Sequence, residues 1–350
     1  MSDNSPLTSE KIKSVDLFFI VGRSRSGTTL LRTILDSNPT IAIPNECTFI
    51  LQLSKRYGKI KVWDSKKTSS FITDLQKTWL FANLQIDLTS LTQQLQELIT
   101  ELDYPLLCKT VLLNCSHIAH KKNIQLIGDK NPSYSLHFNE LYQIFGTACK
   151  YIYINRDYRD QFVSLRNTRF EIPDIVVSTK RWVKAYKSVK KSDCKNIFFV
   201  RYEDLVTEPE ENLRNICRFL GVDFDPGILD FYKKKESLSV YSNESLMGIH
   251  KSITTPLTKN KINLWANELS KNEVAIADRI IGKIAEQCGY ERNSKISVLK
   301  YFFYSFPGHF IYSVVNVSSC LIKYLPFKLY LKFSGGAYLG NVWNRYRKKK

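Results

Sequence analysis

Short apolar runs alternate with helical patterns along most of this chain. The runs cover residues 17–21, 124–127, 151–154 and 197–200. Helical patterns at 157–168 and 209–220 follow the last two runs. Strands that are apolar throughout are buried on both faces, and their alternation with helices is typical of a parallel sheet. We therefore expect an α/β fold of three layers, with a central parallel sheet flanked by helices.

One segment interrupts this alternation, and another follows it. Residues 51–107 contain an amphipathic helical pattern, which we interpret as a helical insertion that forms a cap or a lid. Its apolar face consists of Leu88, Leu91, Leu95, Leu98, Ile99 and Leu102. A last amphipathic pattern near 270–288 stops at Gly289. We therefore expect one domain over 15–291 and a separate extension over 292–350.

The positive charge is concentrated in this extension. The chain has 51 basic and 33 acidic residues, a net charge of +18, and residues 292–350 hold eleven basic residues and no acidic one. A nucleic-acid footprint across the whole protein is therefore not expected. Aromatic and apolar residues with basic flanks suit an anionic membrane surface. The alternative is an extension that packs on the domain and carries a solvated run of charge.

Three further patterns bear on location. Residues 301–322 contain no Lys, Arg, Asp or Glu, but Pro307, Gly308 and several serines interrupt the run and make it a poor spanning helix. The eight cysteines form no C-x2-C pair, which argues against a zinc module and a disulfide framework. The first 14 residues are polar and lack the apolar run of a secretory signal. We expect a cytoplasmic protein, peripheral on the inner face of the membrane if the extension binds lipid.

The strongest motif is the string GRSRSGTT at residues 22–29, between the first apolar run and a helical pattern. Two glycines five positions apart let successive N–H groups point at an anion, and the helix N-terminus adds its positive dipole. The spacing is that of a P-loop, so the expected three-layer fold is P-loop-like. However, Thr28 stands where a P-loop has its lysine. Arg25 inside the loop indicates a phosphate-bearing ligand other than a nucleoside triphosphate.

A second group of residues follows the third apolar run. Arg156 comes directly after that strand, at the end where open α/β sheets bind ligands, and Ser164 lies two turns into the next helix. An arginine fork and a hydroxyl suit a second phosphate. On its own, this segment would be interpreted as a surface helix with solvated charges.

These residues resemble the sulfotransferases that use 3′-phosphoadenosine-5′-phosphosulfate (PAPS). Residues 19–31 are similar to their 5′-phosphosulfate-binding loop, and 156–164 to their 3′-phosphate-binding strand and helix. Similar segments follow at 201–205 and 250–265, and the likeness covers roughly residues 15–291. The chain resembles most the branch that contains the bacterial and tyrosylprotein sulfotransferases.

The resemblance implies transfer of a sulfuryl group from PAPS, as cosubstrate, to an acceptor hydroxyl on a saccharide, tyrosine, lipid or small metabolite, with no metal. Residues at positions that match the family's motifs would contact the cofactor. The 5′-phosphosulfate would be bound by Arg25, Ser26, Gly27, Thr28 and Thr29. Arg156 and Ser164 would bind the 3′-phosphate, and Tyr202 would lie beside the nucleotide. A basic residue is frequent in the family where this chain has Leu264, so Lys259 or Lys261 would serve instead.

The resemblance also implies catalytic roles. Lys130 matches a lysine that contacts the transferring sulfuryl group, and Glu46 matches the general base of the tyrosylprotein branch. Arg25 and Lys130 would supply positive charge where the leaving phosphate oxygen becomes negative. A carboxylate near the pocket mouth can take the acceptor's proton. Among the histidines, His250 is the strongest alternative base.

Two other functional classes remain open from the sequence. A P-loop kinase or NTPase would need a lysine in place of Thr28 and a carboxylate for magnesium, and neither is evident. A non-enzymatic, basic membrane-binding protein would spread its charge over the globular part, whereas most of the excess follows residue 291. The acceptor and the oligomeric state cannot be read from the sequence.

Overall fold

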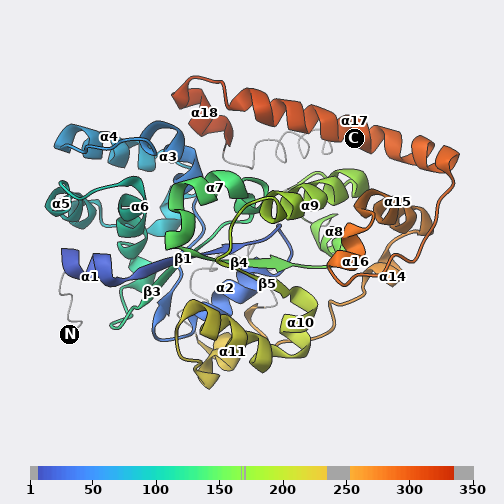
Figure 1. Ribbon diagram of the computed structural model, residues 1–350, viewed down its shortest axis with the longest axis horizontal. Coiled ribbons are helices and arrows are strands. Elements are labelled where there is room, and N and C mark those ends of the chain that lie inside the picture. Colours follow the sequence, from blue (N-terminus) through green and yellow to red (C-terminus); the bar gives the residue numbers. More distant parts are fainter. Residues whose placement is uncertain (1–6, 167, 169–170, 235–252, 335–350) are drawn as a thin grey trace.

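A parallel β-sheet forms the centre of the computed structural model, which describes residues 7–166, 168, 171–234 and 253–334 (Figure 1). Its strands are β1 (Asp16–Val21), β2 (Ile41–Ala42), β3 (Leu126–Lys130), β4 (Lys150–Asn155) and β5 (Ile197–Arg201). Their order is β2-β3-β1-β4-β5, and each neighbouring pair is parallel. The expected α/β fold with a central parallel sheet is therefore confirmed.

Two strands differ from the prediction. β2 has only two residues, too few for a recognisable apolar run. β3 begins two residues later than expected and continues through the polar residues Asp129 and Lys130. These two side chains can lie in a buried strand because each has a partner: Asp129 accepts a hydrogen bond from the Tyr134 hydroxyl, and Lys130 donates to Glu46.

Helices surround the sheet. Those before β3 are α1 (Ser9–Ser14), α2 (Thr28–Asp36), α3 (Phe49–Tyr57), α4 (Ser65–Leu75), α5 (Leu88–Glu97) and α6 (Tyr104–Leu113). Those after β3 are α7 (Phe138–Phe145), α8 (Tyr158–Arg166), α9 (Ile175–Lys190), α10 (Tyr202–Thr207), α11 (Pro209–Leu220), α14 (Trp265–Glu268), α15 (Lys271–Ile281), α16 (Ile284–Gln287), α17 (Val298–Ile322) and α18 (Phe327–Ser334). Short 3₁₀ turns are η1 (Phe81–Leu84), η2 (Ser116–Ile118), η3 (Pro132–Leu136), η4 (Gly146–Ala148) and η5 (Pro226–Lys233).

Successive side chains of β1 enter two different hydrophobic clusters, as the pleat of a strand requires. Phe18 and Ile20 pack in a cluster with residues of α2, α10 and α11. Phe19 and Val21 pack in a cluster with residues of α7 and α9. Figure 1 shows these two groups of helices on opposite faces of the sheet. The fold therefore has the three layers that the apolar runs predict.

The helical insertion at 51–107 is present as α4, α5 and the adjoining parts of α3 and α6. Leu91 and Leu95, on the predicted apolar face of α5, are fully buried. They belong to the same hydrophobic cluster as Phe19 of β1, and α6 packs on β3. These helices are therefore part of the core on this face, and the interpretation of 51–107 as a cap or a lid stays a prediction.

The extension contains a longer helix than its sequence suggests. α17 runs from Val298 to Ile322 and passes through Pro307. Gly308 permits close packing on α9, because a Cβ atom there would lie 2.5 Å from Asp174 Oδ1 and 2.6 Å from Val176 Cβ. Within the described ranges, we find no helix with the length and hydropathy of a membrane span. The expected domain boundary at residue 291 stays a prediction.

We expect Gly308→Val to separate α17 from α9 and to lower the free energy of unfolding by about 1–3 kcal/mol, the usual cost of overpacking. The measurement is urea unfolding followed by circular dichroism. Ser313→Val adds the same β-branched side chain at an exposed position of α17 and serves as the control. Equal stability of the two variants would contradict the close contact at Gly308.

Candidate functional site

The loop between β1 and α2 has the conformation of an anion-binding turn. Arg25 and Gly27 both have positive φ angles, of 70° and 93°. Gly27 also allows close packing, because a Cβ atom there would lie 2.6 Å from Cδ2 of Tyr202. Gly27 precedes the first residue of α2, and its position has no side-chain cap. The first N–H groups of α2 have no intrahelical partner and are available to an anion.

Side chains from distant segments meet beside this loop. Arg25 Nε donates to Ser164 Oγ of α8 at 3.0 Å. Arg156 Nη1 donates to the carbonyl of Arg25 at 3.3 Å, and its Nη2 donates to the carbonyl of Lys261 at 2.5 Å. The Arg156 guanidinium also stacks over the Tyr202 ring, 4.6 Å from its centroid. The structure therefore brings together five of the residues that the sequence predicts for the cofactor.

The structure also distinguishes between the two lysines left open by the sequence. Lys259 is exposed, whereas Lys261 is half-buried and close enough to Arg25 and Arg156 for their charges to affect it. Burial lowers the pKa of Lys261, and these two arginines lower it further. Of these two lysines, Lys261 is therefore the one that lies beside Arg25 and Arg156, and its role at the cofactor stays a prediction.

The electrostatics of this cluster favour an anionic ligand. Burial lowers the pKa of Arg25, and the charge of Arg156 lowers it further. Arg156 Nε and Ser26 Oγ are buried without a hydrogen-bond partner in the described part of the chain. Cations and polar groups that are buried without partners are costly. A phosphate group would supply both the missing acceptor and the missing charge, so the residues present fit such a ligand.

A second group lies on the other side of β1. Lys130, at the end of β3, donates to Glu46 Oε2 at 2.6 Å and to Thr29 Oγ1 at 3.4 Å. The Lys130 side chain is 4% exposed and that of Glu46 is 28% exposed. The ion pair therefore joins a buried cation beside the loop to a carboxylate that reaches solvent. Thr28 is buried, and its methyl group packs near Gly22 at the start of the loop.

Arg32 positions the segment that carries Glu46, and the sequence analysis did not single it out. Its guanidinium is buried and donates to the carbonyls of Ile43 and Pro44 and to the side chain of Asn45. The sequence carries one signal for this residue, because a basic residue within the apolar pattern of α2 must have buried partners. Because Arg32 is on α2 itself, the phosphate loop and the segment before Glu46 are held by one helix.

Asp129, next to Lys130, is also part of this region. Burial raises its pKa to about 7, although the hydrogen bond from Tyr134 acts in the opposite direction. The Tyr134 hydroxyl is itself fully buried, so the carboxyl group and the phenol satisfy each other. We assign this pair a structural role beneath Lys130.

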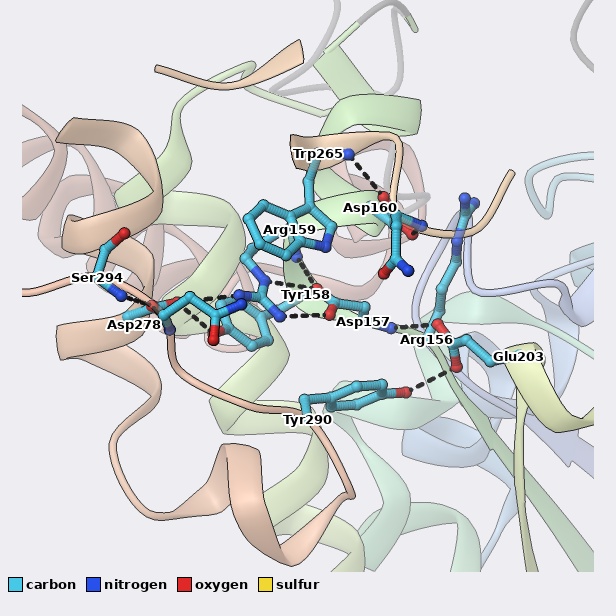
Figure 2. A network of polar contacts seen from close by, with 12 residues as sticks. Arg156, Asp157, Tyr158, Arg159, Asp160, Glu203, Trp265, Asp278, Tyr290 and Ser294 are labelled. Carbon is cyan, nitrogen blue, oxygen red and sulfur yellow. Dashed lines mark hydrogen bonds and ion pairs between the residues drawn. The ribbon is translucent and has the colours of Figure 1, made fainter. Parts of the chain in front are cut away.

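A network of buried polar contacts fixes the start of α8 (Figure 2). Arg159 pairs with Asp157 through two hydrogen bonds, of 3.0 and 2.7 Å, and its guanidinium stacks on Trp265. Glu203 accepts hydrogen bonds from the Asp157 backbone N–H and from the Tyr290 hydroxyl. These contacts hold Asp157, and with it the preceding residue Arg156, in a fixed orientation.

Asp160 connects this network to the segment that contains Lys261. Its carboxylate accepts hydrogen bonds from the backbone N–H groups of Asn263 at 2.7 Å and Trp265 at 2.9 Å (Figure 2). The sequence analysis did not single out Asp160, because its partners are backbone groups more than 100 residues away. His250, the alternative base, lies outside the described residues.

The sequence of this chain matches the model of a known protein family over the region that contains the phosphate loop, Lys130 and Arg156. The model described as "Sulfotransferase family" matches residues 18–226, which is more than half of the chain. The chain belongs to the sulfotransferase family. This sulfotransferase is therefore an enzyme that transfers a sulfuryl group, and the kinase and non-enzymatic alternatives are not favoured.

Relatives of this sulfotransferase include protein-tyrosine sulfotransferase A of Caenorhabditis elegans, 23% identical over 79% of this chain and 67% of the relative. The protein-tyrosine sulfotransferase of Drosophila melanogaster is 25% identical over 73% of this chain and 48% of the relative. The chain thus spans about two thirds of the first relative and about half of the second. The solved sulfotransferase domain of the Synechococcus PCC 7002 olefin synthase is 22% identical, with a TM-score of 0.53 over 83% of this chain and 98% of that domain. This likeness shows the fold.

We expect Asp160→Ala to release residues 263–265, because the carboxylate accepts two charge-assisted hydrogen bonds. A hydrogen bond to a charged group contributes about 1.5–3 kcal/mol, so local opening should rise roughly ten- to a hundredfold. Trypsin cleavage after Lys259 and Lys261 measures this opening. Asp204→Ala, at an exposed carboxylate, is the control. Unchanged cleavage in Asp160→Ala would show that this segment is held by other contacts.

Proposed function

We propose that this enzyme uses PAPS as its sulfuryl donor and releases adenosine 3′,5′-bisphosphate. The observation that supports this most strongly is the cluster of Arg25, Arg156 and Lys261, with Arg156 Nε and Ser26 Oγ buried and unpartnered among the described residues. A donor with phosphate groups at two separate positions matches a site with two groups of anion-binding residues.

The residues would divide between the two phosphate positions. The loop N–H groups, Ser26 and Thr29 would bind the 5′-phosphosulfate at the start of α2. Arg156, Ser164 and Lys261 would bind the 3′-phosphate, in charge-assisted hydrogen bonds.

A cavity beside this cluster suits the base of the nucleotide. It has a volume of about 130 Å³ and lies between α2, α10 and the segment before Lys261. It is lined by Leu30, Tyr202, Val206, Thr255, Pro256, Leu257, Thr258 and Lys261. Its lining is largely apolar, as expected for a surface that contacts a flat heterocycle.

The reaction that we propose needs one general base for the acceptor hydroxyl and positively charged groups beside the leaving phosphate oxygen. The acceptor oxygen forms a bond to sulfur while the bond from sulfur to the phosphate oxygen breaks. Negative charge develops on that phosphate oxygen, where Lys130 and Arg25 stabilise it. Glu46 takes the proton of the acceptor hydroxyl, and its partial exposure leaves it within reach of an acceptor from solvent.

The acceptor side is formed in part by the insertion. Asn83 in η1 accepts from Asn45 through its carbonyl at 3.0 Å and donates to the Glu46 carbonyl at 3.4 Å. The two relatives named as protein-tyrosine sulfotransferases make tyrosine one acceptor to test, beside saccharides, lipids and small metabolites. A screen of these four classes with radiolabelled PAPS identifies the acceptor. No incorporation of label with PAPS, together with phosphate transfer from ATP, would contradict the proposed donor.

We expect Arg156→Ala to weaken binding of adenosine 3′,5′-bisphosphate about ten- to a hundredfold, because a charged hydrogen bond contributes roughly 1.5–3 kcal/mol. Adenosine 5′-phosphate lacks the second phosphate, so its affinity should change much less. Isothermal titration calorimetry with both ligands measures the difference. Arg214→Ala removes an exposed guanidinium on α11 and is the control. Equal losses for both ligands would mean that Arg156 does not read the 3′-phosphate.

We expect Glu46→Gln to lower kcat about 10²- to 10⁴-fold, the usual contribution of a general base, and to leave the affinity for adenosine 3′,5′-bisphosphate near that of the wild type. Glu101→Gln makes the same change at an exposed carboxylate. Near-normal turnover in Glu46→Gln, with loss of turnover in His250→Ala, would assign the base to His250 instead. Loss of both turnover and ligand binding would indicate that Glu46 acts structurally, by holding Lys130.

A further inference from the structure

The face of α17 that points away from the protein is apolar along its whole length. The outer stripe is formed by apolar residues that recur every three or four positions, with the last one just beyond the end of the helix: Leu299, Phe303, Phe306, Phe310, Val314, Val317, Leu321 and Tyr324. Each is exposed, from 48% at Val314 to 86% at Tyr324. A helix of this length extends about 37 Å. An apolar surface this large is typical of an interaction site.

The opposite face of α17 is already packed. Ser305, Gly308 and Val315 are buried, and Lys184 of α9 donates to Asn316 Oδ1 at 2.7 Å. Helices normally bury their apolar face and expose the polar one. Here Val315, Ile311 and Tyr312 pack beside Val177 of α9, while Phe303, Phe306 and Phe310 on the other face are exposed. Figure 1 shows α17 lying across the outside of the molecule, next to α9. The described structure offers no segment that covers the outer stripe.

Basic residues lie at both ends of the outer stripe. Lys295 and Lys300 are exposed near its start, and Lys328 and Lys332 are exposed beyond its end. Residues 292–350 contain no acidic residue. Apolar and aromatic side chains flanked by lysines match the chemistry of an anionic bilayer, whose acyl chains and phosphate groups lie at adjacent depths.

A second copy of the chain matches this surface less well. If two outer stripes packed in parallel, Lys300 of one copy would lie near Lys300 of the other. If they packed antiparallel, Lys300 would lie near the lysines beyond the other end of the second copy's stripe. The extension has no acidic residue that could pair with these lysines. Like charges at a contact disfavour association. An anionic lipid surface supplies the opposite charge.

We propose that α17 binds an anionic membrane surface, parallel to its plane, with the outer stripe inserted at the depth of the headgroups and upper acyl chains. α18 extends the same attachment. It packs on α3, where Gln52 donates to Ser334 Oγ at 2.8 Å and Thr48 donates to Gln52. The membrane-bound extension is thereby joined to the segment that follows Glu46.

The first experiment measures sedimentation of the full chain with vesicles. We expect binding to vesicles of phosphatidylcholine with 30% phosphatidylglycerol and at least tenfold weaker binding to phosphatidylcholine alone. The triple variant Phe303→Ser, Phe306→Ser, Phe310→Ser should lose at least tenfold in affinity for the anionic vesicles. Lys300→Glu with Lys328→Glu should weaken binding similarly, whereas the control pair Lys59→Glu with Lys66→Glu, at exposed positions, should not.

The second experiment does not alter the outer stripe. Cys320 is exposed on α17, so a nitroxide attached to it, in a chain with Cys194→Ser, reports its surroundings. Collision with oxygen should increase and collision with a water-soluble nickel chelate should decrease when anionic vesicles are added. Unchanged collision rates, or a full chain that does not sediment with these vesicles, would overturn the proposal. So would a concentration-dependent dimer in solution that the triple phenylalanine variant dissociates, because a second copy would then cover the stripe.

Discussion

The buried guanidinium of Arg156 is the contact on which the arrangement of the segments beside the phosphate loop depends. From its position directly after β4, it donates hydrogen bonds to the phosphate loop and to the carbonyl of Lys261, and it stacks on the ring of Tyr202. Trp182 of α9 donates to its carbonyl. A buried cation whose Nε has no partner among the described residues is a source of instability until an anion binds. Ligand binding and the ordering of these segments are therefore coupled.

The strand order separates the two halves of the chemistry. β1 is central, so its loop lies between β4 and β5 on one side and β3 and β2 on the other. Arg156 and Tyr202 directly follow β4 and β5, whereas Lys130 is the last residue of β3 and Glu46 follows β2. The insertion lies between β2 and β3 in the chain, and its residue Asn83 contacts the segment that carries Glu46. In the proposed function, changes in the insertion would therefore alter the acceptor side and leave the nucleotide side as it is.

Sequence patterns predicted the features that are encoded in contiguous residues, and they did not predict the features that depend on contacts between distant segments. Apolar runs and a glycine spacing identify β1, β4, β5 and the loop, because each is a contiguous signal. The proximity of Glu46 and Lys130 was available only through the resemblance to a family, since 84 residues separate them. Asp160 binds backbone groups more than 100 residues away, and no contiguous pattern marks it. Arg32 stands out only as a basic residue in the apolar pattern of α2, which does not reveal that it binds the carbonyls of Ile43 and Pro44. For α17, composition indicates an apolar segment, but only packing on α9 shows that its phenylalanines point outward.

The ion pair between Glu46 and Lys130 has a consequence for the charge of the site during catalysis. Before the reaction, the carboxylate and the ammonium group sum to zero. When Glu46 accepts the proton of the acceptor, it becomes neutral, and the pair acquires one positive charge. The leaving phosphate oxygen acquires one negative charge in the same step. In the proposed reaction, therefore, proton removal creates the counter-charge that the leaving group needs, and the net charge of the site stays constant through the step.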